Sequence, residues 1–200
     1  MAADGQLPNL PMSLRRNHVK KSLFALAIVL AFGTVASVQA QPAPAAATAP
    51  ATINDAQIAH IAYTAGQIDV TAAKQALKKS HNKAVLAFAE EMQRDHAAVN
   101  EQALALCKKL GVTPADNPTS QALAKAAAAE QVKLAALSGA AYDKAYAANE
   151  VAFHQTVNKA LSGTLIPAAK NAELKSLLKT GLKLFESHQM HAEHLAQSLK

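Results

Sequence analysis

Apolar residues recur every three or four positions over most of the chain after residue 53, and no segment alternates with a period of two. This spacing is typical of helices that bury one face, and these stretches are rich in strong helix formers such as Ala, Leu, Lys, Gln and Glu. The pattern therefore predicts an all-α protein. We expect helices over about 54–79, 83–110, 120–137, 141–161 and 174–200.

Short turns join the first helix to the second and the fourth to the fifth, so each pair is expected to form an antiparallel hairpin. The long connection between the hairpins holds the shorter third helix. This layout predicts a ferritin-like four-helix bundle with a crossover helix. The expected boundary signals are Asn54 or Thr52, Ser80-His81-Asn82, Gly111, Ser138-Gly139 and a break over 163–167. The low aromatic content of 4% argues against a large ligand cavity.

Several polar residues interrupt the apolar faces of these helices. On the last helix the three-to-four spacing passes through Leu184, His188, His191 and Leu195, which gives two histidines core positions. At ~1.5 Å of rise per residue, the interrupting residues of all the long helices fall near the middle of the bundle. Buried polar groups need a partner or a ligand. The candidate residues are Asp69, Asp95, His96, Glu150, His154, His188 and His191.

Such a group of carboxylates and imidazoles could hold a metal ion, and imidazole-rich ligation suits zinc, copper or iron. The Glu-x-x-His spacing of ferritin-type di-iron sites is absent, because Glu150 and His154 are four residues apart. The alternative is a hydrogen-bond network that orders the core without an ion. On the sequence alone, we favour that network over any single metal.

An enzymatic activity is not expected from the sequence. No nucleophile constellation or phosphate-binding loop is present, and a di-metal oxidase would need bridging carboxylates on at least two helices. Only Asp69 and Glu150 are well placed for that role. Two hypotheses remain: a metal-binding bundle, or a non-enzymatic interaction or stress protein of the cell envelope with a purely structural polar core.

The first 40 residues have the layout of a secretory signal peptide. A positive segment (15–21) precedes an apolar stretch (23–38), and Val38-Gln39-Ala40 fits the small-x-small cleavage pattern. At about 16 residues, the apolar stretch is short of the ~20 that span a bilayer. We predict cleavage after Ala40 and a periplasmic or secreted protein; the alternative is an uncleaved N-terminal anchor. Translation starts at Met1 or at Met12.

Residues 41–52 are rich in Pro and Ala and nearly uncharged, which predicts an extended tether before a helical domain at 53–200. The single cysteine, Cys107, lies far from the cleavage site, so we expect neither a lipid anchor nor an intramolecular disulfide.

The net charge of +6 comes partly from basic residues in the first 40 positions. The remaining basic residues are spread singly along helical faces, so we expect no nucleic-acid binding. We also expect no membrane span after cleavage. The partners left open are a cell-envelope protein and a second copy of the chain.

Several short segments occur in the order seen in one bacterial family of exported proteins. They are 84–92 leading to Asp95-His96, 109–112, 137–146, His154, 172–175 and 184–188. Together they resemble the family called domain of unknown function 4142, often labelled an outer-membrane protein, over roughly residues 53–198.

The resemblance implies export and a ferritin-like bundle, but no activity. It also draws attention to polar positions that recur in the family pattern, namely Asp69, Asp95, His96, His154 and His188. The chain departs from the pattern at Tyr142, where the family has Phe, at Asp69, where Glu is usual, and at Thr180-Gly181, where Leu-Pro is usual.

Overall fold

The computed structural model describes residues 53–200, and within them the chain forms helices and no β-strand. The predicted signal peptide (1–40) and tether (41–52) lie outside these residues. The elements are α1 (Asp55–Lys79), α2 (Lys83–Leu110), α3 (Pro118–Ala135), α4 (Gly139–Ala160), the π-helical turn η1 (Leu161–Leu165), α5 (Ile166–Ala168) and α6 (Ala172–Ser198). The predicted all-α class is confirmed. No helix in this part of the chain combines the length and apolar character needed to cross a bilayer.

Asn54 begins α1 and Gly111 ends α2, as the sequence predicted. The Asn54 side chain accepts from the Gln57 backbone N–H, and the Gln57 side chain accepts from the Asn54 backbone N–H. This capping box therefore pairs both backbone N–H groups. Gly111 ends α2 with a left-handed φ of 64°. The third helix begins earlier than expected, at Pro118, because the Asn117 side chain caps it. Proline is tolerated in the first turn because it has no backbone N–H to leave unpaired.

The predicted break over 163–167 is wrong. The chain stays helical there. In the wider turn of η1 the Ile166 backbone N–H donates to the Leu161 carbonyl, and the helix continues through Gly163 and Pro167. The turn comes later, after Ala168, where both carboxylate oxygens of Asp55 accept backbone N–H groups of Lys170 and Asn171 at 2.8 Å. These bonds tie the start of α1 to the start of α6.

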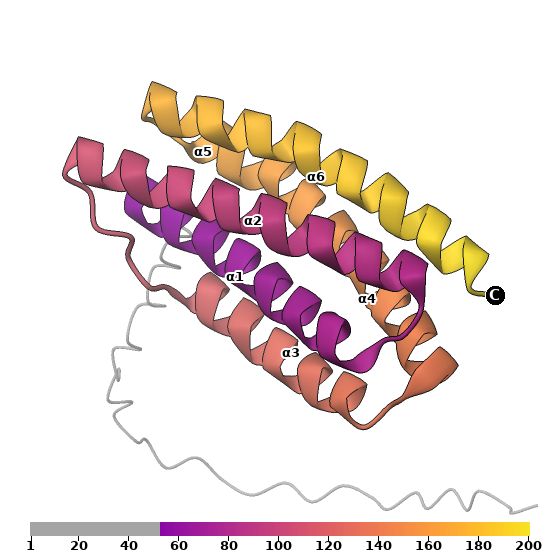
Figure 1. Ribbon diagram of the computed structural model, residues 1–200. Helices are drawn as coiled ribbons and strands as arrows, with labels where there is room; N and C mark the ends of the chain where they lie inside the picture. The colour runs from indigo at the N-terminus through magenta and orange to yellow at the C-terminus, as the bar shows by residue number, and fades with distance from the viewer. Residues whose placement is uncertain (1–52) are drawn as a thin grey trace, which may run out of the picture. The chain divides into compact units, whose positions relative to one another are not determined.

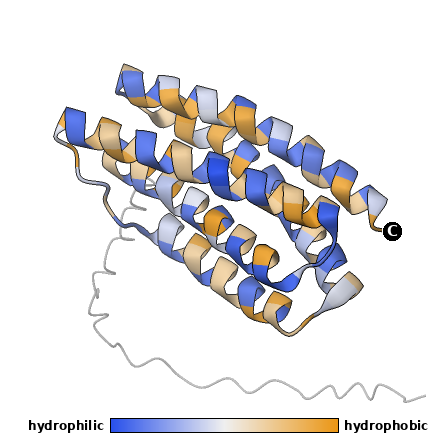
Figure 2. Ribbon diagram, in the orientation of Figure 1, coloured by the Kyte–Doolittle hydropathy of each residue, from blue (hydrophilic) through white to orange (hydrophobic). Residues whose placement is uncertain are grey.

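Two antiparallel hairpins make up the body of the domain (Figure 1). Helices α1 and α2 pack along their length, as do α4 and α6, and α2 also contacts α6. Helix α3 lies along α1 and returns the chain to the start of α4 (Figure 1). Apolar and polar residues alternate in bands along each helix (Figure 2), as expected for helices that each bury one face.

The buried core consists of two apolar clusters. One is built around Phe88, Met92 and Tyr146, and the other around Ile58, Leu178 and Phe185. On each of four helices a buried polar residue separates a member of one cluster from a member of the other. This polar layer consists of Asp69 on α1, His96 on α2, Glu150 and His154 on α4, and His188 on α6.

Candidate metal centre

The five residues of the polar layer are almost completely buried, each at most 2% exposed. Asp69, one of the candidates from the sequence, lies in the core with the other four. Burial of five ionisable side chains at one height costs a large amount of free energy unless they satisfy one another or a ligand. Their contacts therefore decide what this layer does.

Three histidines from three helices meet in the layer. The centroids of the His96, His154 and His188 rings are 5.2–5.6 Å apart. One ring nitrogen of each lies within 4.8 Å of the others, which makes the three a possible ligand set for one ion. The predicted convergence of these histidines is confirmed.

Hydrogen bonds set the tautomers of two of these rings. His188 Nε2 lies 3.1 Å from Asp95 Oδ2, and His154 Nδ1 lies 3.0 Å from the backbone carbonyl of Glu150. Carboxylate and carbonyl oxygens only accept, so in the neutral rings these nitrogens carry the proton. The lone pairs then lie on His188 Nδ1 and His154 Nε2, both of which are buried without a hydrogen-bond partner.

His96 packs differently from the other two. Its ring stacks on Phe185 with centroids 4.5 Å apart and an interplanar angle of 12°. Its Nε2 lies 3.3 Å from Asp69 Oδ2, but neither ring nitrogen makes a hydrogen bond of good geometry. Each of the three buried rings therefore offers a nitrogen that no protein atom satisfies.

Burial keeps these histidines neutral. Desolvation, reinforced by the other two rings, holds the pKa of His96 well below its usual range. Desolvation also lowers the pKa of His154 to about 4, against the opposing bond to the Glu150 carbonyl. It lowers the pKa of His188 as well, despite the Asp95 carboxylate beside it. Neutral imidazole is the form that binds metals.

Asp69 and Glu150 form a carboxyl pair against the histidines, and with His154 they supply ligand atoms within 4.8 Å of one another. Burial, together with the neighbouring Glu150 charge, raises the pKa of Asp69 well above its usual range. Burial raises the pKa of Glu150 to about 7, although its bond to Asp69 acts in the opposite direction. In the absence of a cation, the pair therefore retains a proton near neutral pH.

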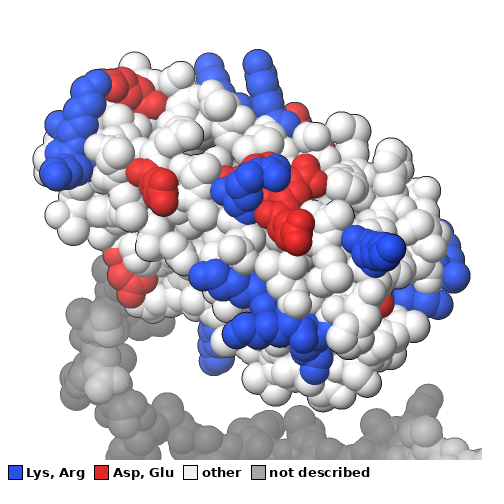
Figure 3. All heavy atoms as spheres, in the orientation of Figure 1, with Lys and Arg blue, Asp and Glu red and all other residues white. Residues whose placement is uncertain are grey.

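Asp95 connects the layer to the surface. It is half-buried, and its Oδ1 accepts from Arg94 Nε at 2.7 Å while its Oδ2 faces His188. Partial burial opposes ionisation, but the bonds from Arg94 and His188 lower the pKa of Asp95 overall. Acidic and basic side chains adjoin over the middle of α2 in Figure 3.

The prediction that His191 occupies a core position is wrong. Its side chain is 48% exposed, and its Nδ1 lies 2.6 Å from Glu91 Oε2. Ala192 is buried in its place, because the buried face of α6 runs through Leu178, Phe185 and Ala192 rather than Leu177, Leu184 and His191. His191 is therefore not part of the buried layer.

Sequence reasoning missed three residues around the centre. Glu91 forms a third group of possible ligands with Asp95 and His188, and its position one turn before Asp95 on α2 could have indicated it. Tyr146 places an unpartnered buried hydroxyl close enough for the Glu150 charge to affect its pKa. Phe185 contacts His96, and only its place on the apolar face of α6 pointed to it.

A family model matches most of the chain. Residues 39–195 match the model of the family described as Domain of unknown function (DUF4142), so the chain belongs to that family. No curated protein and no solved structure matches the chain significantly. The family description names no activity, and the chemistry of the buried site remains the guide to function.

Proposed function

We propose that this protein binds one transition-metal ion through His96, His154 and His188, and serves the cell envelope in metal storage, sensing or stress protection. Zinc, copper and iron are the ions that imidazole ligands favour. Asp69 and Glu150 lie beside His154, and Asp69 also beside His96, so they would supply carboxylate oxygens to a bound ion.

One observation carries the proposal. His154 and His188 each have a proton-bearing nitrogen held by an oxygen acceptor and a second nitrogen, buried and unpartnered, that carries the lone pair. Metal-binding histidines have this same arrangement, in which an oxygen acceptor fixes the tautomer and orients the ring. A hydrogen-bond network that orders the core without an ion would be expected to pair these nitrogens. In the structure no protein atom pairs with them. For this reason we now prefer the metal-binding hypothesis.

The donor set fits a three-imidazole site with an open position. Metal–nitrogen bonds of ~2.0–2.1 Å require the three nitrogens to be closer together than the 4.8 Å limit within which they lie. Binding of an ion by all three rings would therefore draw the nitrogens together through rotation about the histidine side-chain bonds. The layer contains no lysine or arginine that would repel a cation.

Metal analysis of protein purified without a histidine tag tests the proposal. We expect about one ion per chain in wild type, or after reconstitution of chelator-treated protein with Zn²⁺, Cu²⁺ or Fe²⁺. His154→Gln and His188→Gln should lose stoichiometric metal, because each removes one of the three imidazoles. Gln is chosen because it retains polarity and much of the volume of the ring.

His194→Gln is the matched control, since His194 lies on α6 with His188 but is exposed. It should retain the metal content of wild type. Circular dichroism shows whether each variant has folded. The proposal fails if wild type takes up none of the three ions stoichiometrically, or if folded His188→Gln binds them as tightly as His194→Gln does.

The second candidate is an interaction protein whose polar layer is purely structural. The contacts of His96 with Asp69 and of His188 with Asp95 support it, because each pairs side chains from different helices. Under this hypothesis the His188→Gln variant has a lower melting temperature, while metal content is near zero in both variant and wild type.

We further propose that the bundle is ferritin-like. Two antiparallel hairpins, joined by a long connection that contains α3, support this assignment, as does a site built from facing helices at mid-height.

Export of the protein, with cleavage after Ala40, is likewise a proposal. It is supported by the family match, which begins at residue 39, next to the expected cleavage point. Expression of the full chain in a Gram-negative host is expected to give a periplasmic product whose N-terminal sequence begins at Gln41. Retention of residues 1–40 on the product, or its recovery in the cytoplasm, would contradict export.

A further inference from the structure

Within residues 53–200, the buried histidines are connected to the surface at one point. Three residues place an oxygen against a ring nitrogen of these histidines; Asp69 and Glu150 are buried, and only Asp95 reaches solvent. Asp95 Oδ2 lies 3.1 Å from His188 Nε2, and the Asp95 side chain is 19% exposed. A polar connection therefore runs from the buried centre to the surface between α2 and α6.

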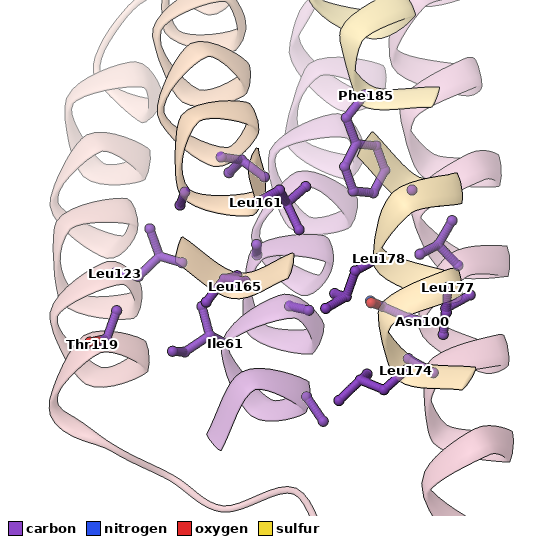
Figure 4. Close-up of a pocket in the computed structure, with 18 of the residues that line it drawn as sticks. Ile61, Asn100, Thr119, Leu123, Leu161, Leu165, Leu174, Leu177, Leu178 and Phe185 are labelled. Atoms are coloured by element: carbon purple, nitrogen blue, oxygen red, sulfur yellow. The ribbon is translucent and has the colours of Figure 1, made fainter. Parts of the chain in front are cut away.

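The two apolar clusters of the described domain offer a metal ion no comparable path. On one side of the polar layer, Phe88, Met92 and Tyr146 are fully buried. On the other side, beyond Phe185, the second cluster contains an apolar cavity of about 230 Å³ (Figure 4). No carboxylate or imidazole lines this cavity, and its one buried polar residue is Asn100, whose Nδ2 has no hydrogen-bond partner. An ion crossing either cluster would lose its hydration without gaining ligands.

Two carboxylates and an imidazole lie where the polar connection meets solvent. Glu91 and Asp95 stand about one turn apart on α2, and His191 of α6 places its Nδ1 2.6 Å from Glu91 Oε2. Ligand atoms of Glu91, Asp95 and His188 lie within 4.8 Å of one another. We call Glu91, Asp95 and His191 the outer group. All three side chains are partly exposed, so a hydrated ion can reach them.

The charge of the outer group favours a cation, although Arg94 lies beside it. Arg94 is mostly exposed, and its Nε pairs with Asp95 Oδ1 at 2.7 Å. Asp95 Oδ2 and the Glu91 carboxylate remain on the side of α6. Two carboxylates beside one guanidinium leave a net negative charge, which raises the local concentration of cations and the rate at which they arrive.

We propose that the outer group is a second, weaker metal site, which captures a divalent transition-metal ion at the surface and passes it to the buried centre. His188 belongs to both ligand sets, since its Nε2 lies against Asp95 while its buried Nδ1 has no partner. The ion therefore changes partners around one imidazole as it moves inward. Exposure to water weakens the outer site, so desalting empties it and leaves about one ion per chain. This inference rests on the proposed function, because transfer requires a buried centre that holds an ion.

The rate at which chelator-treated protein takes up Zn²⁺ tests the transfer, with stopped-flow detection by a chromogenic zinc indicator. Glu91→Gln should load about tenfold more slowly than wild type, which is the lower end of the effect of local charge on association rates. His191→Gln should also load more slowly, because it removes the imidazole of the outer group. Both variants should reach the metal content of wild type at equilibrium, since neither removes a ligand of the buried centre.

Glu90→Gln and His194→Gln are the matched controls, because they make the same changes at exposed positions of α2 and α6. Both should load as fast as wild type. The inference is overturned if Glu91→Gln and Glu90→Gln load at the same rate, since any slowing would then reflect overall charge and not a site.

NMR detects the outer site directly and does not depend on the buried centre. As Zn²⁺ is added to wild type beyond one equivalent, the ring signals of His191 should shift while those of His194 stay in place. Unchanged His191 signals would overturn the inference even if the buried centre loads fully. Failure of wild type to retain Zn²⁺ after desalting would instead contradict the proposed function, whatever the His191 signals show.

Discussion

In the presence of a chelator, we expect the unfolding free energy of Glu150→Gln to fall relative to that of wild type as the pH is lowered. Between pH 7 and pH 4 the difference between the two proteins should change by about 3 kcal/mol. In wild type, the raised pKa of Glu150 stabilises the folded state fully below the ordinary value of 4.5, and this contribution is lost as the pH rises through about 7. The lowered pKa of His154 acts in the opposite sense. Its contribution is present above 6.5 and is lost as the pH falls through about 4.

The two contributions nearly offset each other in wild type, so this part of the layer leaves stability almost independent of pH. Glu150→Gln removes one side of this balance, and of the two groups only His154 then responds to acidification. His154→Gln removes the other side and should gain about 3 kcal/mol relative to wild type over the same pH range. Urea denaturation at intervals between pH 4 and 7 measures both differences. Parallel stability curves for the three proteins would show that the folded-state pKa values are not shifted in these directions.

Phe88→Ala should have the largest effect on stability of any core substitution considered, a loss of about 3–5 kcal/mol. Phe88 is fully buried, and its ring meets Tyr146 at 6.1 Å and His191 at 5.1 Å between centroids, edge to face. Truncation removes these contacts and leaves a void where α2, α4 and α6 meet. For a domain of this size, the loss corresponds to a fall of roughly 10 °C in melting temperature.

Met190→Ala serves as the control, because Met190 is 57% exposed on α6. Its unfolding free energy should stay within about 0.5 kcal/mol of wild type. Chemical denaturation of the two variants beside wild type gives the comparison. A loss below 1 kcal/mol for Phe88→Ala would mean that the apolar cluster around Phe88 collapses to fill the space.

Local signals predicted most of the fold. Asn54 and Asn82 begin helices through their side chains and Gly111 ends one through its backbone, so these boundaries can be predicted from the sequence. The segment from Gly163 to Pro167 misled the prediction, because both residues usually end helices. The π-helical hydrogen bond that accommodates them depends on packing of Leu161 and Leu165 in the core, which local sequence does not report.

The candidate site was predicted in part for a similar reason. His96, His154 and His188 follow from helical spacing and equal height in the bundle. His191 does not belong with them, because residues 188, 191 and 192 are all compatible with one helical face, and packing against α2 and α4 selects Ala192. The tautomers of the rings and the unpaired donor of Asn100 depend on contacts between helices and could not be predicted from any one helix.

The three histidines come from α2, α4 and α6, which lie far apart in the sequence. An ion held by all three would cross-link the bundle at its middle. Such a link would stabilise the folded state, because only the folded chain brings the three rings together, in a domain whose single cysteine allows no internal disulfide. Metal availability would then set how long each molecule survives proteolysis, since the loaded form must release its ion before it can unfold.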